Sequence, residues 1–290
     1  MNIPKNAFVL EVGSGNNPNP RSDILVDRYL FDNGQRAGGF RIFVDRPLVV
    51  ADGYRLPFKD KAFDYVICSH ILEHLPDPKK FIIEMTRIGK AGYIEVPSAV
   101  SERIFGWNFH LWYCAMRGKT LELTKKKDGE RFGGFFHRLI ANQTWFRRFF
   151  EEYENDMYIK LEWKRTVSLR VVRKNPSASA FLSLDRQTNK ILSTARPDAS
   201  LDTVFAFQFF LRRAMRKMRK AVRRISWVVT KTRKRDFLAG FITSFCVCPS
   251  CAGVLQRIGR ALKCSTCGTT YPMIGIIPIL LVPKERKKGY

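Results

Sequence analysis

The first hundred residues of the chain alternate short apolar runs with polar stretches, and several of the apolar runs end in an acidic residue. Such runs are typical of buried parallel strands, whereas the spacing of apolar residues from Pro78 to Ile88 predicts a helix. The predicted strands cover residues 9–12, 23–27, 48–51, 63–68 and 92–97. This rhythm predicts an α/β fold with an open, mostly parallel, Rossmann-like sheet and helices on both faces.

The pattern changes after the fifth predicted strand. Residues 98–136 are rich in aromatic side chains, and we interpret this insertion as a lid over a substrate pocket. Thr144 is predicted to cap a helix over residues 145–153. Two alternating runs, 157–164 and 166–173, are predicted to form a hairpin that completes a sheet of seven strands.

The composition shifts again beyond the predicted first domain, residues 1–174. Residues 175–202 are polar and aperiodic, which predicts a linker. Over residues 203–240 apolar residues recur every three or four positions among Arg and Lys, so this segment is predicted to be a basic amphipathic helix. Between Arg212 and Arg235 lie twelve basic residues and no acidic one, which is about half of the net charge of +25.

Composition limits the partners and the location. A chain of 290 residues with 45% hydrophobic content is long enough to bury a full core. The charge of +25 favours anionic partners, such as nucleic acid or an acidic lipid surface. No signal-peptide pattern precedes the first strand, and no apolar run approaches the length of a membrane span. We therefore expect a cytoplasmic, reducing environment for the seven cysteines.

The turn after the first predicted strand indicates a nucleotide pocket, because its Gly-x-Gly pattern lets a ligand approach the backbone closely. Residues 16–18 are Asn-Asn-Pro where a dinucleotide motif would have its third glycine, which disfavours a pyrophosphate. Asp27 ends the second strand, where a carboxylate suits ribose hydroxyls and would repel phosphate. Asp52 follows the third strand and suits an adenine edge. Together these residues indicate an adenosine group without phosphate.

The glycine turn, Asp27 and the run over residues 52–75 resemble the class I S-adenosylmethionine-dependent methyltransferases, in particular the ubiquinone-type branch with a type 11 domain. The resemblance spans about residues 7–174. It implies S-adenosylmethionine as cofactor, with the methionine part lined by Glu11, Gly13 and Gly15, the ribose held by Asp27 and the adenine beside Asp52. Only about eleven residues separate Gly15 from Asp27, so we expect the helix between the first two strands to be very short or absent.

Two histidines are candidates for the chemical step, in which the enzyme aligns the acceptor and, for a hydroxyl or amine, removes a proton. His70 lies after the fourth strand, in the loop that faces the donor methyl group in the family, and is a candidate base or substrate contact. His110 lies among lid aromatics and is a second candidate base. In the alternative interpretation, His74 braces its loop and the aromatic residues only pack the lid.

Four cysteines near the C-terminus predict a metal site. Their arrangement is CxxC, twelve residues, CxxC, which is typical of tetrahedral zinc ribbons. The predicted ligands are Cys248, Cys251, Cys264 and Cys267 within a ribbon over residues 241–284. With all four ligands supplied by protein, a structural zinc is favoured over a catalytic one. A disulfide, a redox pair or a metal-free remnant remain alternatives.

The segment that continues from Cys267 to Leu281 resembles the small zinc-ribbon activator subunit of eukaryotic tRNA, rRNA and release-factor methyltransferases. This resemblance covers about 40 residues. It implies that one polypeptide carries both a catalytic domain and a module that elsewhere stabilises such domains as a separate protein.

The basic amphipathic helix allows three interpretations. It packs on the first domain with its charges in solvent, it lies on an anionic membrane, or it binds RNA phosphates. Its phenylalanines favour the membrane. The resulting hypothesis is a cytoplasmic methyltransferase, peripheral on the inner membrane face, that methylates an O or N acceptor on an envelope glycolipid or membrane-linked precursor. Methylation of RNA or a translation factor, and a non-catalytic binding scaffold, are the alternatives, and the oligomeric state is left open.

Overall fold

The computed structural model describes the chain in four long stretches and several short ones. The long stretches are residues 1–32, 41–126, 142–173 and 244–286, and the short ones are 136, 139–140, 182–183, 186–188, 190–191, 207–212, 214–215, 218, 221–222 and 240–242. The strands of the first domain are β1 (Val9–Val12), β2 (Ile24–Asp27), β3 (Leu48–Ala51), β4 (Phe63–Ser69), β5 (Gly89–Pro97), β6 (Trp112–Arg117), β7 (Thr120–Lys125), β8 (Tyr158–Lys164) and β9 (Leu169–Val172). Its helices are η2 (Leu72–His74), α1 (Pro78–Ile88), α2 (Ala99–Phe105), α4 (Thr144–Glu152) and α5 (Glu154–Met157).

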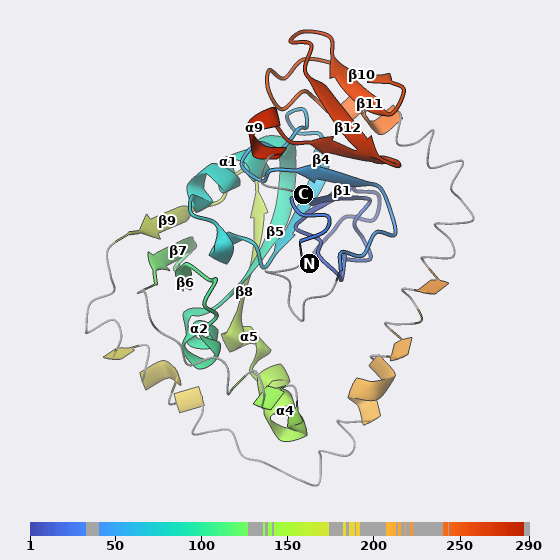
Figure 1. The fold of residues 1–290 in the computed structure, drawn as a ribbon. Helices are drawn as coiled ribbons and strands as arrows, with labels where there is room; N and C mark the ends of the chain where they lie inside the picture. Colours follow the sequence, from blue (N-terminus) through green and yellow to red (C-terminus); the bar gives the residue numbers. More distant parts are fainter. Residues whose placement is uncertain are drawn as a thin grey trace.

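A mixed α/β, Rossmann-like sheet forms the centre of the molecule (Figure 1). Its strand order is β13-β3-β2-β1-β4-β5-β8, parallel from β13 to β5, with β8 antiparallel at the end. From β1 the chain builds outward to β2 and β3 on one side, and β4 and β5 lie on the other. The order therefore reverses beside β1, and the crevice at the carboxyl ends of these strands is where open α/β sheets bind ligands.

Burial explains the elements of the sheet. Every residue of β1, β2 and β3 is buried, as expected for parallel strands covered on both faces. Helix α1 packs on one face through Phe81, Ile82, Met85 and Ile88, and Asp77 caps it by accepting from the Lys80 amide. Its bounds are those that the sequence predicts.

On the other face of the sheet, buried side chains such as Val9 and Tyr65 pack against Ile3 of the N-terminal segment. The short connection from β1 to β2 is described throughout and contains no helix, as its length predicted.

Two sequence-based predictions near the end of this domain are wrong in detail. Strand β9 does not close the central sheet as half of a hairpin; it lies parallel to β7 in a separate sheet of order β6-β7-β9. Arg165, with a φ of 66°, turns the chain away after β8. Helix α4 includes Thr144 and begins after Gln143, without a side-chain cap.

The C-terminal ribbon supplies the seventh strand of the central sheet. Its elements are β10 (Leu255–Ile258), β11 (Ala261–Cys264), β12 (Thr270–Ile274), β13 (Ile277–Leu280) and α9 (Pro283–Arg286). Strands β10 to β13 are antiparallel neighbours, and β13 pairs in parallel with β3, so the ribbon and the sheet are continuous. Figure 1 shows the ribbon at one end of the sheet, opposite α4. The domain boundaries predicted above remain predictions.

In the part of the chain that the structure describes, no helix has the length and apolar character needed to cross a bilayer.

Candidate functional site

The turn after β1 adopts the backbone conformation that its glycines predict. Gly13 and Gly15 have φ values of 70° and 53°, in the left-handed region that disfavours other residues. A Cβ atom on Gly13 would lie 2.0 Å from the Ile71 side chain, so this glycine lets the loop after β4 close over the turn. A Cβ on Gly15 would meet nothing within 4 Å, and the turn therefore borders open space there.

Glu11 is buried beneath this turn. Its Oε2 accepts from the Ser22 hydroxyl at 2.6 Å and from the Asn19 amide at 2.7 Å. Burial raises the pKa of Glu11 to about 7, because desolvation outweighs these hydrogen bonds and the charge of Arg46. Glu11 is thus a carboxyl group whose charge changes near neutral pH.

Asp27 and Asp52 stand at the carboxyl ends of β2 and β3. The Asp27 carboxylate accepts from the amides of Gly15, at 3.3 Å, and Tyr29, at 3.0 Å, which places it beside the glycine turn. Asp52 accepts from the Tyr54 amide at 2.8 Å and forms an ion pair with Arg28. Because Arg28 directly follows Asp27, the ends of both strands are joined at this edge.

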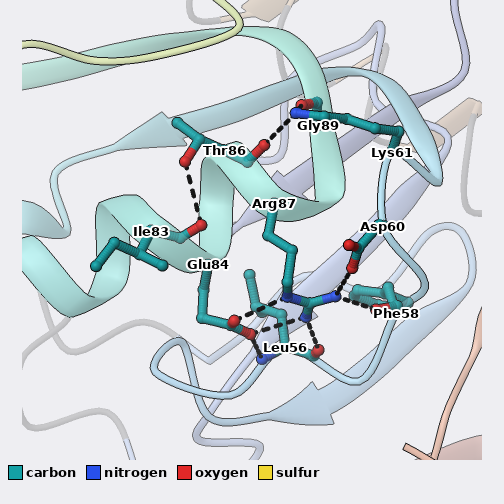
Figure 2. Close-up of polar contacts among 9 residues, drawn as sticks. All are labelled: Leu56, Phe58, Asp60, Lys61, Ile83, Glu84, Thr86, Arg87 and Gly89. Carbon is teal, nitrogen blue, oxygen red and sulfur yellow. Dashed lines mark hydrogen bonds and ion pairs between the residues drawn. The ribbon is translucent and has the colours of Figure 1, made fainter.

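The loop after β3 is fixed to helix α1 by Arg87 (Figure 2). The guanidinium donates to the carbonyls of Leu56, at 2.8 Å, and Phe58, at 2.7 Å, and to Asp60 at 2.8 Å. Glu84 accepts from Arg87 with both oxygens, at 2.8 and 2.9 Å, and also accepts from the Leu56 amide at 2.8 Å. Hydrogen bonding to Glu84 raises the pKa of Arg87 and keeps it charged.

His70 lies between two carboxylates after β4. Its Nδ1 is 3.4 Å from Glu73 Oε1, and its Nε2 is 3.2 Å from Glu95 Oε1. Burial by itself would lower the pKa of His70, but the neighbouring carboxylates of Glu73 and Glu95 together raise it to about 9. In this arrangement His70 is a cation at neutral pH, a form that donates protons or hydrogen bonds to an acceptor.

His110 is held by a buried ionic group in the segment that is predicted to form the lid. Its Nδ1 lies 2.7 Å from Glu102 Oε2, and Lys126 pairs with the other oxygen of Glu102. The ring of His110 meets that of His74 at a centroid distance of 4.7 Å. The two histidines singled out from the sequence, His70 and His110, therefore flank the same pair, Glu73 and His74.

The four cysteines of the ribbon converge. Their sulfur atoms all lie within 4.8 Å of one another, with Cys248 and Cys267 3.7 Å apart and Cys251 and Cys264 3.5 Å apart. Tetrahedral zinc with Zn–S bonds of about 2.3 Å needs sulfurs about 3.8 Å apart, so the cluster has the dimensions of such a site. The Tyr271 hydroxyl lies 3.0 Å from Cys248 Sγ.

Sequence reasoning missed several members of these groups. The contacts of Arg28 with Asp52 and of Arg87 with the loop after β3 lack a local signal, because these partners lie 24 to 31 residues away. Glu102 is only eight residues from His110, but helix α2 ends at Phe105 between them, so no helical or strand period relates the two.

Part of this sheet lies in a segment whose sequence is similar to known proteins. Residues 32–94 match the family described as "Methyltransferase domain". Demethylmenaquinone methyltransferase of Renibacterium salmoninarum is 34% identical over 102 residues, which is 34% of this chain and 43% of that protein. Its namesake in Corynebacterium urealyticum is 44% identical over 57 residues, 20% of this chain and 24% of that protein. The chain thus spans less than half the length of these curated relatives.

Two solved structures are also similar. A Bacillus halodurans protein described as a methyltransferase shares 21% identity, covering 35% of this chain and 55% of the other, with a TM-score of 0.27. A chain from the complex of the Haloferax volcanii Trm112 methyltransferase activator with a methyltransferase shares 15% identity, covering 57% of this chain and 85% of the other, with a TM-score of 0.35.

The family match lies on β3, β4, α1 and most of β5, and it includes Asp52 and the loop that carries His70. These elements belong to the sheet whose strand order reverses beside β1. The segment from residue 32 to residue 94 is therefore similar to the methyltransferase domain family, and the demethylmenaquinone methyltransferases share sequence with part of this chain.

Proposed function

We propose that this protein is an S-adenosylmethionine-dependent methyltransferase acting on an oxygen or nitrogen acceptor. The observation that carries the proposal is the meeting of the glycine turn with Asp27 at the edge where the strand order reverses. The proposed cofactor residues are Glu11, Gly13, Gly15, Asp27 and Asp52. The cofactor supplies an electrophilic methyl group on a sulfonium.

Each of these residues has a role suited to an adenosine-containing ligand. Asp27 is positioned by two backbone amides, and a carboxylate is an acceptor group suited to ribose hydroxyls. Open space beside Gly15 admits the ligand close to the backbone. Asp52, held by Arg28 and the Tyr54 amide, is proposed to lie at the adenine edge.

On the acceptor side, we propose that His70 and His110 contact the substrate. As a cation, His70 would orient an acceptor by donating a hydrogen bond, and it would act as a base only once it has lost its proton. The Nδ1 atom of His110 faces Glu102, so its other ring nitrogen, Nε2, is the atom that would contact the acceptor.

Calorimetric titration of S-adenosylmethionine tests the pocket. We expect Asp27→Ala to weaken binding by about 10- to 100-fold, because a hydrogen bond to a charged group contributes on the order of 1.5–3 kcal/mol. Glu285→Ala, an acidic residue of helix α9, is the matched control and should bind as the wild type does. Unchanged affinity in both Asp27→Ala and Asp52→Ala would refute the residue assignment.

For the acceptor, we propose an envelope glycolipid or other membrane-linked precursor, reached at an anionic membrane surface. The support is a set of apolar side chains on described helical residues that face solvent. They are Phe207, Phe210, Leu211, Met215, Met218 and Val222, each at least 42% exposed. Apolar residues and a dense basic charge on one segment suit a headgroup boundary.

Vesicle flotation tests this acceptor class. Wild-type protein should float with vesicles of phosphatidylglycerol and phosphatidylcholine, whereas the double variant Phe207→Ser/Phe210→Ser should float less. Phe209→Ser is the control, because Phe209 lies under the Arg147 guanidinium at 4.3 Å rather than in the exposed set. Salt-sensitive binding to tRNA without flotation would support RNA methylation instead, and pocket binding without methyl transfer to either acceptor would support a scaffold.

We also propose that the four cysteines hold a structural zinc ion in this cytoplasmic protein. Their spacing fits tetrahedral coordination, and four protein ligands leave no open position for a substrate.

A further inference from the structure

A second group of potential metal ligands lies away from the cysteines. Glu73, His74 and His110 each present one ligand atom, and these three atoms lie within 4.8 Å of one another. Glu73 and His74 belong to η2, directly after β4, and His110 comes from the lid segment before β6. Side chains from two distant segments therefore converge on one point.

The carboxylate of this group is buried without hydrogen bonds. The Glu73 side chain is 1% exposed, and neither of its oxygens accepts a hydrogen bond within the described part of the chain. The Nδ1 atom of His74 is also buried without a partner. His70 Nδ1, at 3.4 Å from Oε1, offsets the charge of Glu73 but leaves Oε2 with no counterpart. A buried carboxylate oxygen without a partner is costly, and a second cation beside Oε2 would offset that cost.

His110 is oriented as a metal-binding imidazole is. Glu102 engages Nδ1 at 2.7 Å, which leaves the lone pair of Nε2 for a ligand bond. Metal-bound histidines commonly donate a hydrogen bond from their other ring nitrogen to a carboxylate in this way. Lys126 pairs with Glu102 and donates to the Trp107 carbonyl at 2.8 Å, so the supporting carboxylate is itself held in place.

The two segments are also joined through their backbones. The Leu111 amide donates to the Glu73 carbonyl at 2.8 Å, and the Trp112 indole donates to the Leu75 carbonyl at 2.8 Å. These bonds hold the lid in register with η2. Packing of His74 on Phe109, with ring centroids 5.4 Å apart, accounts for the position of the His74 ring. It does not provide hydrogen-bond donors for the Glu73 oxygens.

We propose that Glu73, His74 and His110 bind one divalent transition-metal ion of the Zn²⁺ or Co²⁺ class, separate from the cysteine site. Two imidazoles and one carboxylate suit such ions and leave coordination positions for oxygen ligands. If the proposed methyltransferase function holds, an acceptor oxygen would occupy one of those positions, and His110 would then contact the acceptor through the ion. Binding of the ion itself does not depend on that function.

Metal stoichiometry of the full chain tests the site. The protein is stripped with a chelator, refolded with excess Co²⁺ and desalted, and cobalt per chain is then measured by mass spectrometry. We expect two ions in the wild type, with visible absorption from a nitrogen–oxygen site in addition to thiolate-to-cobalt bands. Glu73→Gln and His110→Ala should each retain one ion and the thiolate bands, whereas Cys251→Ser should lose those bands and keep the other spectrum.

Two further variants separate ligand loss from general damage. Glu102→Gln should weaken binding of the second ion by about 10- to 100-fold, as substitution of a residue that hydrogen-bonds to a metal ligand commonly does. Glu122→Gln, a carboxylate on β7 of the same lid, should bind two ions with wild-type affinity. One ion per wild-type chain, with thiolate bands alone, would overturn the proposal, as would two ions in folded Glu73→Gln and His110→Ala.

The two proposals fail separately. Calorimetry that detects no S-adenosylmethionine binding, with two cobalt ions present, would refute the function and leave the site standing. Binding of S-adenosylmethionine by a chain that holds one cobalt ion would refute the second metal site and leave the proposed function standing.

Discussion

At the scale of single residues, Glu11 shows how burial and hydrogen bonding compete. Two donors and the nearby Arg46 favour its ionised form, yet the removal of water dominates and raises its pKa to about 7. His70 shows the opposite balance, because two carboxylates overcome the effect of burial on an imidazole. Near the carboxyl ends of β1 and β4, a carboxyl group that is partly neutral and a charged histidine are therefore present at the same pH.

The raised pKa of Glu11 predicts a pH dependence of stability. Folded Glu11 keeps its proton up to a pH of about 7, whereas the unfolded chain releases it near 4.5, so the free energy of unfolding should fall as the pH rises between these values. Relative to Glu11→Gln, we expect the wild type to lose roughly 3 kcal/mol over this range. Urea unfolding of both proteins from pH 4.5 to 8 measures the difference, with exposed Glu154→Gln as control. Curves for wild type and Glu11→Gln that run parallel would contradict the prediction.

At the scale of elements, helix α1 positions the loop that follows β3. Arg87 reaches two carbonyls and Asp60 of this loop while Glu84 holds the guanidinium, so one turn of helix fixes a segment without regular structure (Figure 2). The same loop meets the first residues of the ribbon, where the Lys59 amide donates to the Phe245 carbonyl at 2.9 Å. Asp52 thus begins a loop that is fixed on both sides.

Removing this guanidinium should destabilise the domain. Arg87→Ala leaves the Glu84 carboxylate and two loop carbonyls without their donor, and we expect a loss of about 2–4 kcal/mol in the free energy of unfolding. Arg87→Lys keeps the charge but not the planar fork, so its loss should be smaller. Lys79→Ala, an exposed position on the same helix, should change stability by about 0.5 kcal/mol or less. Chemical denaturation provides the values, and an Arg87→Ala protein as stable as Lys79→Ala would rule the interpretation out.

At the scale of the whole molecule, the ribbon is part of the main fold. Strand β13 covers the edge of β3, and Cys248 and Tyr271 belong to the same hydrophobic cluster as β1, β4 and α1. An uncovered parallel edge would expose backbone donors and acceptors. Loss of the ribbon would therefore affect the sheet that carries Asp27 and Asp52.

Removal of the proposed zinc should show this coupling. Structural zinc contributes on the order of 10 kcal/mol to small domains, so chelation or Cys267→Ser should unfold the ribbon and lower the melting temperature of the first domain. Lys263→Ala, an exposed residue of β11, serves as the control. Differential scanning calorimetry with and without added zinc measures the effect. An unchanged transition of the first domain after complete zinc removal would show that the ribbon does not support the sheet.

Local signals in the sequence determined the strands of the sheet, helix α1, the glycine turn, the acidic residues that end β2 and follow β3, and the spacing of the four cysteines. Each depends on neighbouring residues, through apolar periodicity, the conformational freedom of glycine or the reach of a short loop. Only the tertiary structure decided that β13 rather than β9 completes the central sheet, because a strand edge offers the same backbone hydrogen bonds to any partner. It alone also brought Glu73 and His74 to His110, since such convergence depends on how distant segments pack and leaves no period in the sequence.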